Sequence, residues 1–197
     1  MQFLNMYTVG TKSNDINANN LEFYWYGVWN IVLGYWFQPR FLVVPQYMIS
    51  YELVNRDDNT ICKCVKPDFV VTKYSYENDT FSEHIQLIVE IKRSSNNPKK
   101  DFKSISKQLD KQITTLFTKG KYEHMYGIIT VGQCWKLYKY NFVKTNTHKR
   151  TWSNTSYTNK DHIENFEVVE ESGILNISSK DYYNDFNELM RSLNQIP

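Results

Sequence analysis

The chain lacks several features that would place it in a specialised class of protein. Its three cysteines, Cys62, Cys64 and Cys134, are an odd number, and Cys-Lys-Cys is too short for a usual zinc knuckle. We interpret them as reduced thiols of an intracellular protein, cytoplasmic or nuclear. The first residues lack the basic and apolar regions of a signal peptide, and no apolar run reaches membrane-spanning length. We therefore expect no membrane partner.

A strong excess of charge of one sign is also missing. The net charge is +2 over 197 residues, which is not typical of a dedicated nucleic-acid coat, so local clusters matter more than the total. Hydrophobic residues make up 41% and aromatic residues 16%, which excludes a disordered chain and allows a sizeable core. With no internal repeat or low-complexity tract, we expect a single domain over residues 1–197. Its core should cover about 21–142, followed by a loop and a C-terminal extension at 143–197.

The spacing of apolar residues predicts the order of helices and strands. Spacings of three and four predict an aromatic-rich helix over residues 21–37 and a second helix over 99–118. Apolar, β-branched runs predict strands at 41–54, 61–72, 85–92, 126–131 and 134–142, with a strand at 166–169 and a helix at 180–196 in the tail. The predicted fold class is α/β, with a central mixed sheet flanked by helices. The core order is helix, three strands, helix, two strands, and a helical extension follows.

Two short acidic motifs stand within the predicted strands. One is Pro67-Asp68, and the other is Glu90-Ile91-Lys92, whose Glu90 and Lys92 point to the same face of a strand. If the two strands pair as an antiparallel hairpin with Asp68 opposite Glu90, the connection falls at about residues 75–83, which are rich in turn formers. In that register Val70 faces Ile88 and Thr72 faces Gln86.

Two carboxylates placed in this way favour a metal site. Directly opposite residues have Cβ atoms about 5 Å apart, and like charges there are destabilising unless a cation lies between them. Carboxylate oxygens suit Mg²⁺ or Mn²⁺, and the carbonyl of Ile91 could add another oxygen. Lys92 could orient and help deprotonate a water, or stabilise charge on the phosphate in the transition state. The reaction class that these residues indicate is metal-assisted hydrolysis of a phosphodiester.

The motifs and their order resemble the PD-(D/E)xK nuclease superfamily. Pro67-Asp68 and Glu90-Ile91-Lys92 lie on two adjacent predicted strands, and the resemblance spans about residues 21–142. It implies a restriction-endonuclease-like fold and a Mg²⁺-dependent nuclease that prefers DNA to RNA. It also implies Asp68 and Glu90 as metal ligands and Lys92 as the catalytic lysine. The run at 126–135 is similar to fungal-type, restriction-endonuclease-like proteins of eukaryotes.

The same resemblance points to three further residues. Many members carry an acid on the helix before the strands, and Glu22 is the only acid on that helix here, although the helix dipole alone would also favour it. RecB-like members carry a glutamine on the helix after the Glu-x-Lys strand, which makes Gln108 a candidate. Gln112 lies within the apolar arc as either a site residue or a buried polar one. The tyrosine that follows the glutamine in RecB-like enzymes is absent.

A basic cluster follows the second motif. Its members are Arg93, Lys99, Lys100, Lys103 and Lys107. Beside a phosphodiesterase site they would contact the phosphate backbone, whereas the simpler interpretation is a solvated helix face. The odd number of strands and the aromatic content are compatible with a homodimer. The alternative function is a catalytically inactive module on the same fold that binds nucleic acid or protein.

Overall fold

The computed structural model describes residues 22–54, 60–77, 79–93, 98–118, 122–142, 166–177, 179 and 182–194. Three helices lie within these ranges: α2 (Glu22–Phe37), α3 (Pro98–Thr118) and α4 (Tyr182–Asn194). The strands are β1 (Leu42–Pro45), β2 (Ile49–Val54), β3 (Thr60–Val65), β4 (Phe69–Glu77), β5 (Thr80–Lys92), β6 (His124–Val131), β7 (Cys134–Phe142), β8 (Phe166–Glu171) and β9 (Leu175–Asn176). No described helix is long and apolar enough to cross a membrane.

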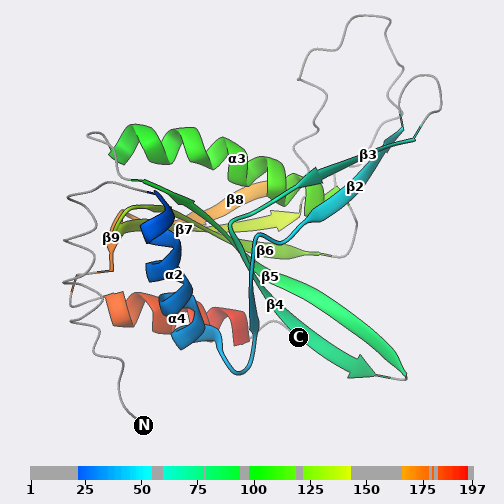
Figure 1. Cartoon of the computed structure of the whole chain (residues 1–197), viewed down its shortest axis with the longest axis horizontal. Coiled ribbons are helices and arrows are strands. Elements are labelled where there is room, and N and C mark those ends of the chain that lie inside the picture. The colour runs from blue at the N-terminus through cyan, green and yellow to red at the C-terminus, as the bar shows by residue number, and fades with distance from the viewer. Residues whose placement is uncertain are drawn as a thin grey trace, which may run out of the picture.

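The centre of the molecule is a mixed sheet, as the sequence predicts. Its strand order is β1-β4-β5-β6-β7-β8, and β9 adds to β7. The pair β5–β6 is parallel, because α3 carries the chain from the end of one strand back to the start of the other, and the other pairs are antiparallel. The pair β2–β3 forms a separate two-stranded sheet (Figure 1).

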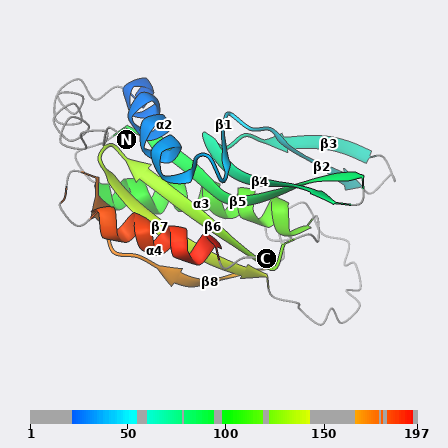
Figure 2. The same ribbon diagram turned by 90° about the horizontal axis from the view of Figure 1, so that it is seen from below.

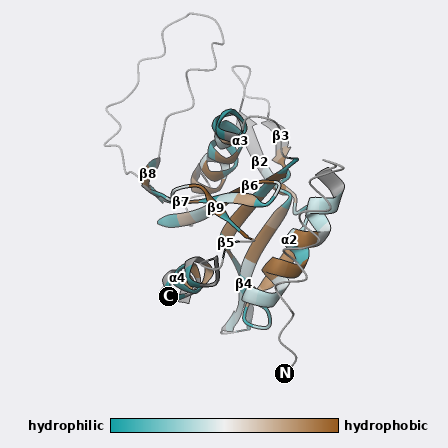
Figure 3. Cartoon of the chain, turned by 90° about the vertical axis from the view of Figure 1, so that its left-hand side faces the viewer, coloured by the Kyte–Doolittle hydropathy of each residue, from teal (hydrophilic) through white to brown (hydrophobic). Residues whose placement is uncertain are grey.

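Helices cover both faces of the sheet. α3 lies on one face, and α2 and α4 lie on the other, so that the sheet forms the middle layer (Figures 2 and 3). Alternation along β4 divides the core: Phe69 and Val71 pack on the α2/α4 side, and Val70 packs under α3. Both sides of the central strands are therefore buried, which explains their continuous apolar runs.

α3 is the helix that the apolar spacing predicts. Five apolar residues at spacings of three and four along it are buried: Phe102, Ile105, Leu109, Ile113 and Leu116. The helix approaches β6 closely at Gly127, where an added Cβ would lie 2.6 Å from a methyl carbon of Leu109. The missing side chain of Gly127 thus lets α3 lie flat on the strand that neighbours β5.

Two predicted strands are each divided in two, which corrects the three-strand expectation. The run at 41–54 becomes β1 and β2, and the run at 61–72 becomes β3 and the start of β4. Pro45 and Pro67 stand at the breaks, and proline cannot donate a ladder hydrogen bond. Gln46, directly after Pro45, has a positive φ of 53°. The chain therefore changes direction there and lets β2 and β3 form their own ribbon.

The predicted connection between the two motif strands is also wrong. β4 continues to residue 77 and β5 begins at residue 80, so most of the run at 75–83 is strand. The turn is tight and contains Asp79 with a positive φ of 58°. A β-bulge after Val71 pairs Thr72 with Ile85 instead of Gln86. The long β4–β5 ribbon projects beyond the rest of the sheet (Figure 1).

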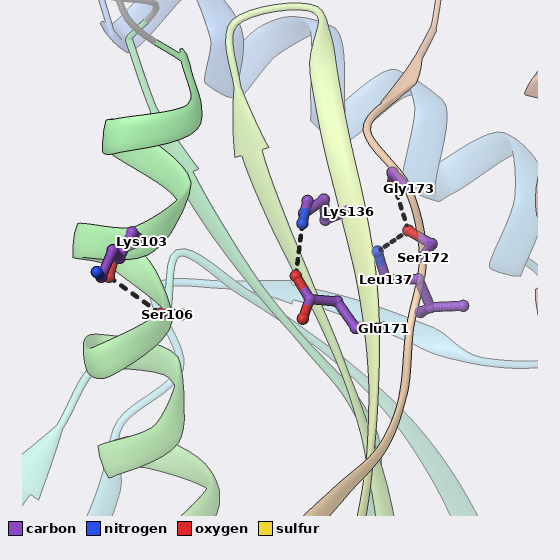
Figure 4. Close-up of polar contacts among 7 residues, drawn as sticks. All are labelled: Lys103, Ser106, Lys136, Leu137, Glu171, Ser172 and Gly173. Atoms are coloured by element: carbon purple, nitrogen blue, oxygen red, sulfur yellow. Dashed lines mark hydrogen bonds and ion pairs between the residues drawn. The ribbon is translucent and has the colours of Figure 1, made fainter.

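The C-terminal segment belongs to the same sheet and core. β8 pairs with β7, where Lys136 and Glu171 form an ion pair and Ser172 accepts the N–H of Leu137 (Figure 4). Phe186 of α4 stacks on Trp135, with ring centroids 4.6 Å apart. The expected extension thus completes the α2/α4 face. Residues 143–165, which include the predicted loop, lie outside the described part of the chain.

Candidate functional site

Asp68 and Glu90 meet where β4 begins and β5 approaches its end. Phe69 pairs with Val89 and Val70 with Ile88, so Asp68, one residue before β4, comes opposite Glu90. This part of the predicted register is confirmed. Both carboxylates are buried: Asp68 is 6% exposed and Glu90 is 0% exposed. Glu90 alternates in phase with Ile88 and lies on the face that α3 covers, whereas the carboxylate of Asp68 is reached by Tyr26 from α2.

Asp68 accepts hydrogen bonds from three different parts of the chain. Its Oδ1 accepts the hydroxyl of Tyr26 from α2 and, at 3.3 Å, the side-chain amide of Gln46. Its Oδ2 accepts the backbone N–H of Ile91 at 2.6 Å. Asp68 precedes the first residue of β4, so β4 offers no backbone carbonyl to the N–H of Ile91. The side chain of Asp68 accepts this N–H instead.

Glu90 accepts hydrogen bonds from two glutamines of α3. Gln108 donates from Nε2 to Oε2 at 2.6 Å, and Gln112 donates from Nε2 to Oε1 at 2.5 Å. The two residues are one helical turn apart, so both reach the same carboxylate. The predicted candidate Gln108 therefore contacts Glu90 from the exposed margin of the helix, and Gln112, left open by the sequence, contacts it from the buried side.

The electrostatics of the pair favour a further positive charge. Burial, and then the charge of Asp68, raise the pKa of Glu90 to about 7, while Gln112 and the charge of Lys92 act in the opposite direction. Lys92 lies two residues beyond Glu90 on the same face of β5 and is half-buried. Two facing carboxylates at this depth are costly to ionise together, and a bound cation would remove that cost.

The donor set fits a hard cation. Asp68 and Glu90 offer carboxylate oxygens, which Mg²⁺ and Mn²⁺ prefer. The N–H and C=O of one strand residue project to the same edge, so the carbonyl of Ile91 lies on the edge where its N–H meets Asp68. The amide oxygen of Gln112 is buried and has no hydrogen-bond partner within the described structure. That atom could serve as a further oxygen ligand of a cation beside Asp68 and Glu90.

Other potential ligands do not join this set. Among the residues that the structure describes, no group of three or more His, Cys, Asp or Glu side chains could hold a metal ion. Glu22, the predicted further ligand, is the first residue of α2, one turn before Tyr26. Its side chain lies outside the described part of the molecule. The site that can be described therefore consists of two carboxylates and neighbouring neutral oxygens.

The predicted basic cluster lies beside the carboxylates. Arg93 is exposed after β5, and the exposed lysines of α3 are Lys99, Lys100, Lys103, Lys107 and Lys111. Lys100, Lys103, Lys107 and Lys111 recur at spacings of three and four and so share one side of the helix. Gln108, which contacts Glu90, borders this side. The lysine row thus lies beside Gln108, which reaches from the exposed margin of α3 to the buried carboxylate of Glu90.

Sequence reasoning missed two contacts to Asp68. Tyr26 lies in an aromatic helix in which every ring reads as core, and Gln46 stands in a run that reads as one uninterrupted strand. Only the packing of α2 against the start of β4, and the break after β1, bring them to the carboxylate. The one signal in the sequence is that Tyr26 lies one helical turn after the candidate ligand Glu22, so that the two residues share a side of the helix.

Comparisons with known proteins add no relative. No protein-family model matches the chain, and no curated protein or solved structure matches it significantly.

Proposed function

We propose that the protein is a metal-dependent nuclease of the PD-(D/E)xK type that hydrolyses phosphodiester bonds, with DNA preferred to RNA. The observation that supports this most directly is the buried pair Asp68 and Glu90, with Lys92 two residues along the same face of β5. A packed core favours apolar residues at such positions, and two facing acids there are destabilising without a cation.

The chemistry follows from the groups that surround the pair. A bound Mg²⁺ or Mn²⁺ would polarise the scissile phosphate and lower the pKa of a water. Tyr26 and the N–H of Ile91 hold Asp68 in one orientation, and Gln108 and Gln112 hold Glu90. Lys92 would orient the attacking water, or neutralise charge that develops on the phosphate. The burial of both carboxylates keeps bulk water away from them.

The arrangement of elements is compatible with a restriction-endonuclease-like fold, which forms part of the proposal. A helix precedes the motif strands, β4 and β5 carry the two motifs side by side, and α3 leads to a parallel neighbour, β6. The lysine row of α3, with Arg93, would contact phosphates of the substrate. An intracellular location and a homodimer remain predictions that accompany this function.

Nuclease assays of the purified protein test the proposal. We expect cleavage of duplex or single-stranded DNA with Mg²⁺ or Mn²⁺ and none with EDTA, with RNA substrates assayed in parallel. Asp68→Ala and Lys92→Ala should each abolish cleavage. Lys139→Ala is a matched control, since Lys139 lies on β7 over the ring of Tyr126 and away from the motifs. Cleavage that survives Asp68→Ala unchanged would exclude this site.

One observation favours the alternative, a catalytically inactive binding module. Every oxygen of the two carboxylates already accepts a hydrogen bond from the chain itself. A network satisfied in this way could hold the fold together without any cation. Calorimetry separates the two functions: Mg²⁺ or Mn²⁺ binding that disappears in Glu90→Ala supports the nuclease, whereas nucleic-acid binding without cation binding supports the module.

A further inference from the structure

The hydrogen bonds to Asp68 are distributed unequally between its two oxygens. A carboxylate has about four lone-pair positions, two on each oxygen. Oδ1 accepts both Tyr26 and Gln46, whereas Oδ2 accepts only the N–H of Ile91. One lone pair of Oδ2 is therefore left by these three contacts, while those of Oδ1 are both used. A cation would find a single oxygen of Asp68 available.

The two donors to Oδ1 are held in place independently of the carboxylate. The ring of Tyr26 packs against Phe69, with ring centroids 5.9 Å apart, and α2 packs against the sheet. The backbone N–H of Gln46 donates to the carbonyl of Asp68 at 2.8 Å, which fixes Gln46 beside it. The amide of Gln46 also donates to the hydroxyl of Tyr26 at 3.5 Å. Rotation of the Asp68 carboxylate would break several of these contacts together.

Single-oxygen ligation has a consequence for the choice of metal. Ca²⁺ takes six to eight oxygens in flexible geometry and often uses both oxygens of a carboxylate, whereas Mg²⁺ demands a compact octahedron. We propose that Tyr26 and Gln46 are specificity-determining residues, which restrict Asp68 to one oxygen and so select Mg²⁺ or Mn²⁺ against Ca²⁺. This inference rests on the proposed function, because it concerns the cation of the same site.

Metal titrations of the full chain test this selectivity by calorimetry, with Mg²⁺, Mn²⁺ and Ca²⁺ each used alone. Tyr26→Phe removes the hydroxyl and keeps the ring on Phe69. Gln46→Asn shortens the amide and keeps a residue that tolerates a positive φ. Tyr35→Phe is the control, because the same change is made on α2 where the ring packs edge-on against Trp36. Circular dichroism establishes that each variant is folded.

We expect Tyr26→Phe to shift the ratio of Ca²⁺ to Mg²⁺ affinity towards Ca²⁺ by about tenfold or more, the range in which outer contacts of metal ligands act. Gln46→Asn should shift it less in the same direction, and Tyr35→Phe should leave it unchanged. An unchanged ratio in a folded Tyr26→Phe that binds Mg²⁺ would overturn the inference and leave the nuclease proposal standing. If Tyr26→Phe is not folded, Gln46→Asn decides by the same criterion. Absence of cation binding in the unmodified protein would overturn both.

Discussion

The two faces of the main sheet are built by the same strands but differ in chemistry. The α2/α4 face is packed with large aromatic side chains, among them Trp25, Trp29, Trp135 and Phe186, all of them fully buried. The α3 face holds buried polar groups in the same layer as its apolar residues, namely Glu90, Gln112 and Thr72. Burial of a carboxylate costs far more free energy than burial of a neutral polar group, and the fully buried carboxylate of Glu90 places that cost on the α3 face. The buried polar atoms that lack a hydrogen-bond partner among the described residues of the other face, such as the indole nitrogens of Trp25 and Trp135, are neutral. This difference suggests that the α2/α4 face supports stability and the α3 face supports function.

The largest effect should be loss of cleavage when the α3 face is changed at Glu90. Glu90→Ala should lower the rate by about 10⁴-fold or more, the scale on which removal of one member of a catalytic unit acts. Single-turnover cleavage assays measure this rate. Glu83→Gln is the control, because Glu83 lies nearer the start of β5 and accepts hydrogen bonds from Tyr47 and Tyr74 instead. If both variants lose activity equally, the carboxylate pair has no special role.

A change on the opposite face should act on stability instead. Phe186→Ala removes a ring that stacks on both Trp135 and Trp36, and truncation of a buried phenylalanine costs about 3–5 kcal/mol. We expect this loss in urea unfolding, with metal affinity unchanged under conditions where the variant is folded. A variant of wild-type stability with impaired metal binding would remove the distinction between the faces.

The pH dependence of stability should also originate on the α3 face. The pKa of Glu90 is raised from 4.5 to about 7, so the folded state binds more protons than the unfolded state between these values. The free energy of unfolding in EDTA should therefore fall as the pH rises from about 4.5 to 7, by an amount on the order of 3 kcal/mol. Glu90→Gln should lose most of this slope. Chemical denaturation at a series of pH values measures it, and equal slopes in the two proteins would contradict Glu90 as the cause.

The smallest effects come from a matched pair of glycines. Gly127→Ala would place a Cβ 2.6 Å from Leu109 under α3, and overpacking of this kind costs about 1–3 kcal/mol. Gly27→Ala lies within α2, where an added Cβ meets no atom within 4 Å, and should stabilise by up to about 1 kcal/mol. Thermal unfolding distinguishes the two signs. Stabilisation by Gly127→Ala would mean that α3 is free to move away from β6.

Local patterns were sufficient for much of the fold. The helix at 22–37, the helix at 98–118 and the strand at 134–142 follow from apolar spacing, because each segment buries one continuous surface. Gly132 has the positive φ that the hairpin turn between β6 and β7 requires. The pairing of Val70 with Ile88 is that of the assumed register with Asp68 opposite Glu90; since both faces of these strands are buried, apolar alternation accepts this register but does not select it.

Other features of the fold needed information that local patterns do not contain. The bulge after Val71 and the separation of β2–β3 from the main sheet depend on how several strands share one face. Proline at positions 45 and 67 could have indicated the breaks, but a single proline is also tolerated at the edge of a sheet. The tight turn at residue 79 was not predicted, because the β4–β5 ribbon extends past the core. There, apolar alternation no longer indicates which residues of the two strands pair.

The candidate site divides in the same way. The sequence alone determined the acids, the lysine and their spacing, because residues two apart on a strand share a face whatever surrounds them. Only the tertiary structure decided what contacts the acids: Tyr26 from α2, Gln46 after β1, and Gln112 from the buried side of α3. These donors lie 22 to 42 residues from their acids along the chain, and such separations say nothing of which side chains packing brings together.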